Sequence, residues 1–402
     1  MTISHRGADR IRAGHVWVYR SDIVEAKEVQ PGAWVMVQED QGGRGRPPHT
    51  RLLGTAFYST ASQIALRMIS PHPVSNLAQL LRERIRNAIA YRERFVANTN
   101  AYRVVFSEGD FLPGLIVDRY KDILSIQVLT QAMDLDSIRE VVISELVEKL
   151  QPAVIVEKVD ARVRQLEQLP KKEGGLVYED AALRRSTLHD QITAEIQMNG
   201  VRFLYDALGG QKTGAFLDQR ENYAASAKYA RGEALDVFCY QGGFALHLAR
   251  TCEKITGVDS SRPALETAEK NAGLNGHDIE WIEANAFDLL RDYSDQGMKY
   301  DFIVLDPPAF AKSRRDLPTA LRGYKELNLR ALKMLRPGGI LLSCSCSYHV
   351  SEADLLETIS AAALDSHRVL GLLESRGASV DHPRIIGIPE TAYLKCMIII
   401  VN

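Results

Sequence analysis

Cysteine is scarce in this chain of 402 residues. Five cysteines are present, an odd number, and no two of them have the CxxC spacing that is common in metal and redox sites. A secreted disulfide-rich domain relies on an even set of paired cysteines. We therefore expect neither a disulfide framework nor a zinc site, and the sequence predicts no metal centre.

Long apolar segments are also missing. No hydrophobic run approaches the ~20 residues that a membrane-spanning helix needs, and the first residues are polar and basic, without the apolar core of a signal peptide. A composition of 46% hydrophobic and 25% charged residues is typical of a soluble globular protein. We expect a cytoplasmic protein without a membrane partner.

An excess of charge of either sign is absent as well. The 49 Lys and Arg residues are balanced by 51 Asp and Glu residues, which leaves a formal net charge of -2. Any surface that binds nucleic acid must therefore be a local patch. The length of 402 residues predicts two or three domains.

Three units are predicted along the chain: residues 1–72, 73–190 and 191–402. The first contains short β-prone runs at 16–19, 34–37, 52–58 and 64–68, separated by Gly, Pro and polar residues, with a Gly-rich loop at 42–48. It is locally basic, and Arg10 and Arg12 are candidates for phosphate contacts. The second mixes helices at 77–96 and 135–150 with strands, as a small α+β domain does, and its helical arginines are interpreted as a solvated face.

From residue 191 onward strands and helices alternate. Strands are expected at 235–240, 254–259, 279–283, 302–305, 340–343, 369–373 and 397–401, and helices at 243–250, 262–271, 317–335 and 351–363. This alternation is typical of a doubly wound α/β sheet. Ligands bind such sheets at the carboxyl ends of the strands.

One carboxylate is predicted at that edge by its neighbours. The run 302–305 is a short apolar strand that stops at Asp306, which is followed by Pro307 and Pro308. Proline cannot donate to a sheet ladder, and it restrains the residue before it to an extended conformation. The sequence therefore holds Asp306 at the carboxyl end of a central strand.

A nucleotide-type cofactor is predicted at the same edge. Gly242 and Gly243 would let the backbone approach a ligand at a helix N-terminus. Asp259 ends the next strand, where an acid can bind ribose hydroxyls, and Asn285 with Ala286 follows the third strand, where they can hold an adenine edge. The dinucleotide fingerprint GxGxxG is absent, because the segment at 239–244 reads CYQGGF, and this disfavours NAD relative to S-adenosylmethionine.

Several segments resemble one known family. They are GQKTGAFLDQR at 210–220, DPPAFAK at 306–312, GYKELN at 323–328, SCS at 345–347, DHP at 381–383 and PETAYLK at 389–395. With them, the third unit resembles a class I S-adenosylmethionine-dependent methyltransferase, similar to the bacterial 23S ribosomal RNA cytosine-C5 methyltransferases that carry an N-terminal PUA domain. The run RIRAGHVWVY at 10–19 resembles the opening of that RNA-binding PUA domain.

The resemblance implies a Rossmann-like methyltransferase sheet after a PUA-like domain and an α+β domain, with S-adenosyl-L-methionine as cofactor. It implies ribosomal RNA, expected to be 23S, as partner, with a homodimer as a possible assembly. Catalytic roles fall on Cys346 and Asp306. Cofactor contacts are predicted at Arg220, Asp236, Tyr240, Gly242, Asp259, Ser260, Asn285, Ala286 and Asp306. RNA contacts are predicted at Arg10, Arg12, Lys312, Arg314 and Lys325.

The chemistry at cytosine C5 needs a nucleophile, because a thiolate that adds to C6 makes C5 reactive. Cys344 and Cys346 share a parity at the end of one strand, so both point to one face if that strand is regular. Packing is the commoner fate of a free cysteine; the resemblance assigns the nucleophile to Cys346. Asp306 could bond either the base or the cofactor, and Phe310 offers a ring for an unpaired base.

Alternative functions stay open at this point. The family usually has Asp where this chain has Asn285, whose amide both accepts and donates. Ala309 separates Phe310 from the proline pair, which disfavours methylation of an exocyclic amine. A guanine-N7 or other base methyltransferase needs no cysteine adduct, and a non-catalytic RNA-binding factor would not bind the cofactor.

Overall fold

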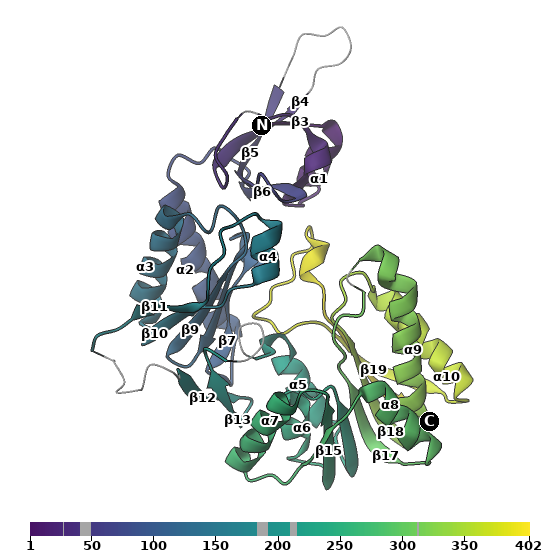
Figure 1. The fold of residues 1–402 in the computed structure, drawn as a ribbon. Helices are drawn as coiled ribbons and strands as arrows, with labels where there is room; N and C mark the ends of the chain where they lie inside the picture. Colours follow the sequence, from purple (N-terminus) through teal and green to yellow (C-terminus); the bar gives the residue numbers. More distant parts are fainter. Residues whose placement is uncertain (27, 41–49, 183–191, 210–214, 312) are drawn as a thin grey trace. The chain divides into compact units, whose positions relative to one another are not determined.

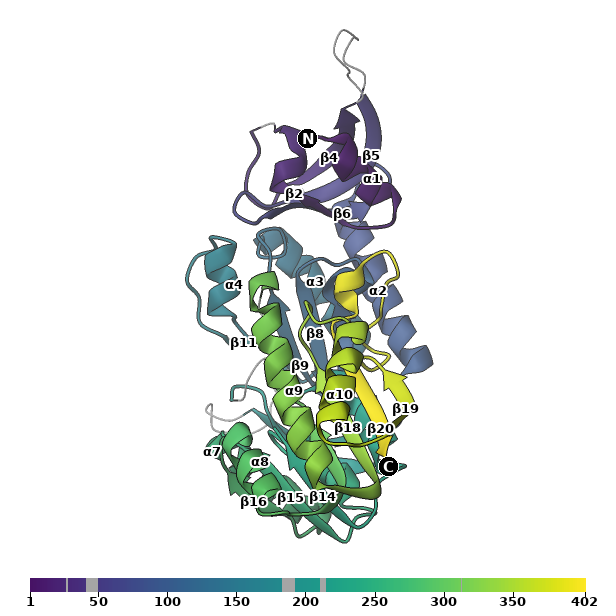
Figure 2. The same cartoon turned by 90° about the vertical axis from the view of Figure 1, so that its right-hand side faces the viewer.

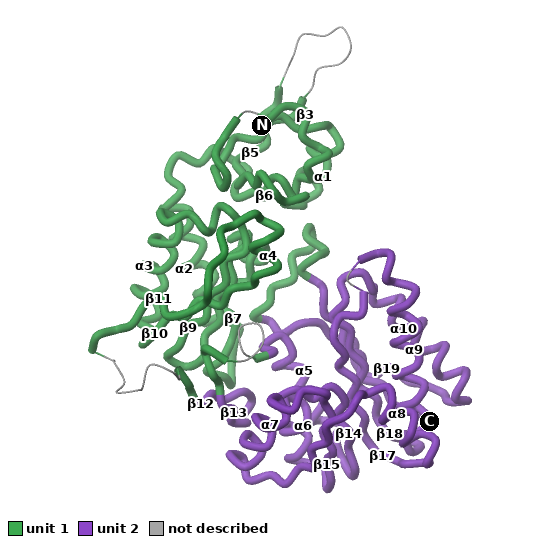
Figure 3. Tube along the Cα trace, viewed as in Figure 1, with its two compact units in different colours: residues 1–194, 205–215, 381–391 green, residues 195–204, 216–380, 392–402 purple. Residues whose placement is uncertain are grey.

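The computed structural model describes residues 1–26, 28–40, 50–182, 192–209, 215–311 and 313–402 (Figure 1). The loop predicted at 42–48 lies outside this part of the chain. Two compact units are formed (Figure 3): residues 1–194, 205–215 and 381–391 make unit 1, and residues 195–204, 216–380 and 392–402 make unit 2. None of the helices that are described is at once long and apolar enough to cross a membrane.

The first sheet of unit 1 has six strands, and one short helix packs against it. The strand order is β2 (Trp17–Tyr19), β6 (Ile64–Ser70), β5 (Thr50–Tyr58), β4 (Trp34–Asp40), β1 (Thr2–Ile3) and β3 (Ile23–Glu25). The sequence did not predict β1, β3 or the helix α1 (His5–Arg12), a short helix that turns only Ala8 and Ile11 toward the apolar core. Its N-cap was a usable signal, since Ser4 Oγ accepts a hydrogen bond from Gly7 N at 3.2 Å.

The second sheet of unit 1 is covered by two long helices. Its strand order is β11 (Gly175–Glu179), β10 (Val154–Glu157), β9 (Ile123–Val128), β8 (Leu115–Tyr120) and β7 (Ala101–Phe106). The helices are α2 (Leu77–Phe95) and α3 (Asp136–Leu150), and the short α4 (Ala161–Leu166) follows β10. Leu81 and Ile85 of α2 pack into one apolar core with Val117 of β8. The predicted boundary at residue 72 falls between β6 and α2.

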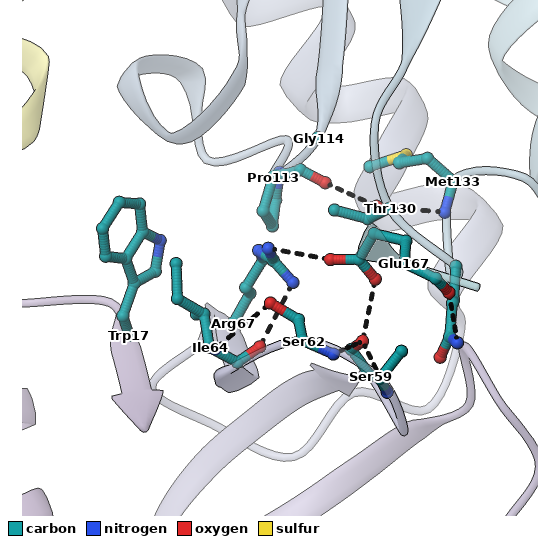
Figure 4. Close-up of polar contacts among 12 residues, drawn as sticks. Trp17, Ser59, Ser62, Ile64, Arg67, Pro113, Gly114, Thr130, Met133 and Glu167 are labelled. Atoms are coloured by element: carbon teal, nitrogen blue, oxygen red, sulfur yellow. Dashed lines mark hydrogen bonds and ion pairs between the residues drawn. The ribbon is translucent and has the colours of Figure 1, made fainter. Parts of the chain in front are cut away.

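A buried polar cluster links the two sheets of unit 1 (Figure 4). Glu167, directly after α4, accepts hydrogen bonds from Ser59 Oγ at 2.8 Å and Arg67 Nη2 at 3.2 Å. Gln131 Nε2 donates to the Glu167 carbonyl oxygen at 2.8 Å. Because these groups are desolvated, their geometry fixes the attachment of the first sheet more specifically than apolar contact alone would.

Arg92 of α2 is fully buried, so the interpretation of this helix's arginines as a solvated face is wrong at this position. Its guanidinium forms an ion pair with Asp110 in the 3₁₀ turn η2 (Ser107–Asp110), with 2.8 Å between Nη2 and Oδ2. It also donates to the carbonyl oxygens of Arg103 at 2.9 Å and Asp381 at 2.7 Å. Every strong donor direction of this buried cation is therefore used to join separate segments.

The segment Asp381–Thr391, which we call the strap, packs with unit 1 although it lies late in the sequence. Asp381 Oδ2 accepts a hydrogen bond from Arg103 N at 2.9 Å, and Glu390 Oε2 lies 3.1 Å from His15 Nε2. Ile388 is fully buried in the apolar core of the first sheet. The sequence division that assigned 381–391 to the third unit therefore differs from the packing.

Replacing Arg92 with Met should destabilise unit 1 by about 3–5 kcal/mol, because it leaves the carboxylate of Asp110 buried without its cation. The measurement is the free energy of unfolding in urea. Arg94→Met is the matched control on the same helix, and since Arg94 is exposed the change should stay within about 0.5 kcal/mol. Equal stabilities of the two variants would contradict the structural role given to Arg92.

Unit 2 is built on a seven-stranded sheet. Its order is β16 (Glu280–Glu283), β15 (Lys254–Asp259), β14 (Glu233–Val237), β17 (Tyr300–Leu305), β18 (Leu335–Ser345), β20 (Lys395–Val401) and β19 (Leu370–Arg376). The pairs from β16 to β18 are parallel, and β20 is antiparallel to both of its neighbours. The hairpin of β12 (Thr193–Met198) and β13 (Val201–Asp206) turns at Asn199 and Gly200, both with positive φ.

Helices cover both faces of this sheet. One face carries α5 (Arg220–Ala227), α6 (Gly243–Leu248) and α7 (Arg262–Asn275). The other carries α8 (Ala286–Asp295), α9 (Leu317–Met334) and α10 (Glu352–Asp365), and Figure 2 shows α9 and α10 in front of β18 and β20. Leu235, Ile303 and Leu341 from three adjacent strands form the fully buried centre of the core. The doubly wound sheet predicted from the sequence is confirmed.

Candidate active site

Five parallel strands end at one edge of the sheet in unit 2. They are β16, β15, β14, β17 and β18, and β17 occupies the middle of the sheet, as predicted for the strand before Asp306. Asp306 Oδ1 accepts a hydrogen bond of 3.0 Å from Nε2 of Gln219, which ends the 3₁₀ turn η3 (Leu217–Gln219). No group of three or more His, Cys, Asp or Glu side chains in the described ranges could hold a metal ion.

The loop after β14 adopts an unusual backbone path. β14 ends at Val237 and not at residue 240, because Phe238 and Tyr240 have left-handed φ angles of 68° and 49°. Gly242 follows with φ of 85°, and a Cβ there would lie 2.9 Å from the ring of Trp281. Tyr240 N donates to Asp259 Oδ2 at 2.9 Å. The loop is thus wound tightly against the end of β15, and Gly242 is needed for both its angle and its space.

Asp236 is a fully buried carboxylate under this loop. Its Oδ2 accepts a hydrogen bond from Ala245 N at 2.8 Å, whereas Oδ1 has no hydrogen-bond partner among the described residues. Burial raises the pKa of Asp236 to about 8, the Ala245 N–H opposes that shift, and the nearby carboxylates of Asp306 and Asp259 add to it. A cation placed here would satisfy the orphaned oxygen and offset the repulsion.

Two more predicted cofactor residues lie at the first turn of α8, next to β16. Asn285 is the N-cap of α8, and its Oδ1 accepts hydrogen bonds from Phe287 N at 2.9 Å and Asp288 N at 3.4 Å. This orients the amide nitrogen of Asn285 as the group left to donate. Ala286 is buried in the first turn of α8.

Ser260 and Arg220 occupy different surroundings from each other. Ser260 is exposed directly after Asp259, the carboxylate of which also accepts a hydrogen bond from Ser261 N at 2.9 Å. Arg220 is buried at the start of α5, with Nη2 3.5 Å from Glu221 Oε1. The structure therefore brings the predicted cofactor residues to one sheet edge, with Arg220 held in the interior.

Cys344, near the end of β18, and Cys346, just after it, have separate environments. β18 ends at Ser345, so the regular strand that would point both thiols to one face does not reach Cys346. Cys344 is fully buried opposite Cys396, and burial raises the pKa of its thiol well above the usual value. Cys346 is partly exposed, and its Sγ lies 3.8 Å from the carbonyl oxygen of Pro307 in the Asp306 loop. Only Cys346 combines access with proximity to that loop.

The basic residues predicted to contact RNA are divided between the units. In unit 1, Arg10 pairs with Asp22 at 2.9 Å and Arg12 pairs with Asp9 at 2.8 Å and with Glu39. In unit 2, Arg314 is exposed in the turn η4 (Arg314–Asp316), and Lys325 Nζ lies 2.8 Å from Asp365 Oδ2. Lys312 lies outside the described residues.

The ring of Phe310, which the sequence offers to an unpaired base, has one side packed against unit 2. It is partly buried against the domain core, with its centroid 4.8 Å from that of Tyr324. Sequence reasoning missed Gln219, Tyr324 and Lys395 as members of the site. Each lies in a segment that carried the family resemblance, but only the packing shows which atoms they contact.

A parallel sheet with carboxylates at its carboxyl edge is typical of α/β enzymes that bind nucleotide cofactors. The chain belongs to the S-adenosylmethionine-dependent methyltransferase family, whose sequence pattern matches residues 178–388, and a PUA-like domain matches residues 1–71. S-adenosylmethionine is the cofactor.

Relatives extend the match over nearly the whole chain. The ribosomal RNA large subunit methyltransferase I of Photobacterium profundum is 34% identical over 396 residues, covering 96% of this chain and 95% of that protein. Its namesake in Shewanella denitrificans is 36% identical over 398 residues, covering 96% and 94%. A crystal structure of a candidate methyltransferase complexed with SAH shares the fold, with a TM-score of 0.82, 18% identity and coverage of 100% and 99%.

The residues at the sheet edge fit this cofactor. S-adenosylmethionine carries a sulfonium and an ammonium group, and a cation would stabilise the orphaned Oδ1 of Asp236 and the two carboxylates near it, Asp259 and Asp306. The tight glycine at 242 and the N-terminus of α6 allow the backbone N–H groups to approach a ligand.

The raised pKa of Asp236 predicts how the stability of the cofactor-free protein depends on pH. It is about 8 in the folded state against 3.8 for the free residue, so the folded state binds more protons between these values, and stability should fall as pH rises through that range. Each unit of pKa difference is worth about 1.4 kcal/mol. Asp236→Asn should flatten this decline in the free energy of unfolding.

The control for this measurement is Asp278→Asn, which neutralises an exposed carboxylate in the same unit. It should keep the wild-type pH dependence. An unchanged slope in Asp236→Asn would show that this carboxylate does not titrate as its burial requires.

Proposed function

We propose that this protein methylates C5 of a cytosine in 23S ribosomal RNA through a transient bond between Cys346 and C6. The names of the relatives and the PUA-like domain support a ribosomal RNA substrate. The observation that carries the C5 assignment is the position of Cys346: a partly exposed thiol beside the Asp306 loop at the cofactor edge.

Each residue has a defined part in this reaction. When bound, S-adenosylmethionine supplies an electrophilic methyl group. The Cys346 thiolate adds to C6 of the base, which raises the electron density at C5, the atom that receives the methyl group. Loss of the C5 proton then lets the cysteine leave. Asp306, fixed by Gln219, is placed to hydrogen-bond the amino edge of the base or of the cofactor.

The cofactor contacts are proposed at the strand ends. Asp259 binds the ribose hydroxyls, Asn285 and Ala286 the adenine edge, and Asp236 the cationic end. Gly242 and Tyr240 shape the loop between them, Ser260 extends the ribose side, and Arg220 pairs with the cofactor carboxylate.

Residues 1–72 are proposed to supply RNA affinity and not chemistry. Arg10 and Arg12 share the last turn of α1. Arg10 pairs with one carboxylate and Arg12 with two, and a guanidinium has five N–H donors, more than these pairs use. Arg314 and Lys325, with Lys312, are proposed to contact phosphates near the methylated base.

Cys346→Ala should abolish methylation while cofactor binding, measured by calorimetry, stays intact. Cys344→Ala is the matched control and should keep most activity, because Cys344 is buried and its raised pKa disfavours a thiolate. RNA with 5-fluorocytosine at the target should form a covalent adduct with wild type and with Cys344→Ala, since fluorine cannot leave C5 as the proton does. Gel shift under denaturing conditions detects it.

Full activity of Cys346→Ala would end the adduct mechanism and favour a ring-nitrogen methyltransferase, which needs positioning alone.

Arg10→Gln and Arg12→Gln should weaken RNA binding and flatten its salt dependence, because fewer counterions are released when a phosphate contact is lost. Each lost contact should reduce the slope of log Kd against log salt concentration by about 0.7–0.9. The measurement is log Kd against log salt concentration. Arg94→Gln removes an exposed arginine elsewhere in unit 1 and should leave the slope unchanged. A wild-type slope in both α1 variants would mean that this helix does not touch phosphate.

A further inference from the structure

The serines on either side of Cys346 are joined through one buried hydroxyl. Ser345 Oγ donates to Tyr324 Oη at 3.0 Å, and Tyr324 Oη lies 3.1 Å from Ser347 Oγ. Both serine side chains and Tyr324 are buried. Because Tyr324 lies on α9, the turn that carries the cysteine is tied to a helix as well as to its own strand.

The same serine reaches the Asp306 loop. Ser347 Oγ accepts a hydrogen bond from Ala311 N at 3.2 Å, and Ala311 belongs to the segment that follows the proline pair. The thiol and the loop that carries Asp306 are therefore held in register by a chain of hydrogen bonds. Hydrogen bonds in such a desolvated chain strengthen one another.

Lys395 holds the turn from its other side. Its Nζ donates to the carbonyl oxygens of Ser347 at 2.7 Å and Tyr393 at 2.8 Å, and its Cα pairs with that of Ser345 across the antiparallel ladder. The side chain is buried, and burial lowers the pKa of the lysine to about 8, opposed by the nearby Cys346. Burying an ammonium group costs free energy. If this side chain served only for packing, an apolar residue would be more stable in its place.

We propose that Tyr324 and Lys395 are positioning residues that fix the Cys346 thiol for attack on the base. The inference rests on the cysteine mechanism proposed above. The ladder of β18 stops at Ser345, so strand pairing does not hold Cys346. Side-chain hydrogen bonds to Ser345 and Ser347 take over that task, and a displacement of about 1 Å at a reacting atom can cost on the order of a hundredfold in rate.

Tyr324→Phe tests this by removing one oxygen while keeping the ring that packs on Phe310. The experiment compares the rate of adduct formation on 5-fluorocytosine RNA with the Kd for S-adenosylmethionine. We expect the adduct rate to fall at least about tenfold, with cofactor affinity within twofold of wild type. Lys395→Met should give the same pattern, and the double variant should show less than the product of the two effects, because both act through Ser347.

Tyr300→Phe is the control, since it makes the same change to a buried tyrosine at the start of β17, the end of the strand away from Asp306. It should form the adduct at the wild-type rate. A wild-type rate in Tyr324→Phe, or an equal loss of cofactor binding and adduct rate, would overturn the positioning role and leave the cysteine mechanism standing. Absence of an adduct with the wild-type protein would instead overturn the mechanism itself, and this inference with it.

Discussion

Parallel pairing of β15, β14, β17 and β18 is the constraint on which the rest of unit 2 depends. Parallel strands bring their carboxyl ends to one edge of the sheet. Residues far apart in the sequence therefore become neighbours there, although no local sequence pattern links them. Asp259, Asp306 and Cys346 each follow or end one of these strands. The helices on both faces bury the strands and leave that edge as the part open to a ligand.

This arrangement concentrates negative charge. Burial raises the pKa of Asp236, and the nearby carboxylates of Asp306 and Asp259 raise it further. A fold that was selected for stability alone would avoid such a cluster. The cluster instead suits a cationic cofactor, because the attraction of the carboxylates for its positive charge offsets their mutual repulsion.

Local patterns predicted most of unit 2 from the sequence. The apolar strand runs, Asn199-Gly200 and the proline pair after Asp306 each act within a few residues, and the structure has the corresponding elements. The small helix α1 was missed because it spans only eight residues, of which only Ala8 and Ile11 meet the apolar core.

Long-range contacts could not be predicted in the same way. Arg92 differs from its exposed neighbours on α2 only in facing Asp110 and Asp381, which lie elsewhere in the chain. Tyr324 and Lys395 gain their place beside Cys346 from packing of α9 and β20 around β18. A sequence pattern shows that a residue is polar, whereas only tertiary packing shows what it meets.

The strap has a consequence for synthesis. The apolar core of the first sheet contains Met1 and Ile3 together with Ile388. The strands of this sheet lie within residues 2–70, yet Ile388 follows Ser70, the last residue of β6, by 318 residues. The nascent sheet must therefore wait with an unfilled position in its core while the chain from β7 to β19 is translated.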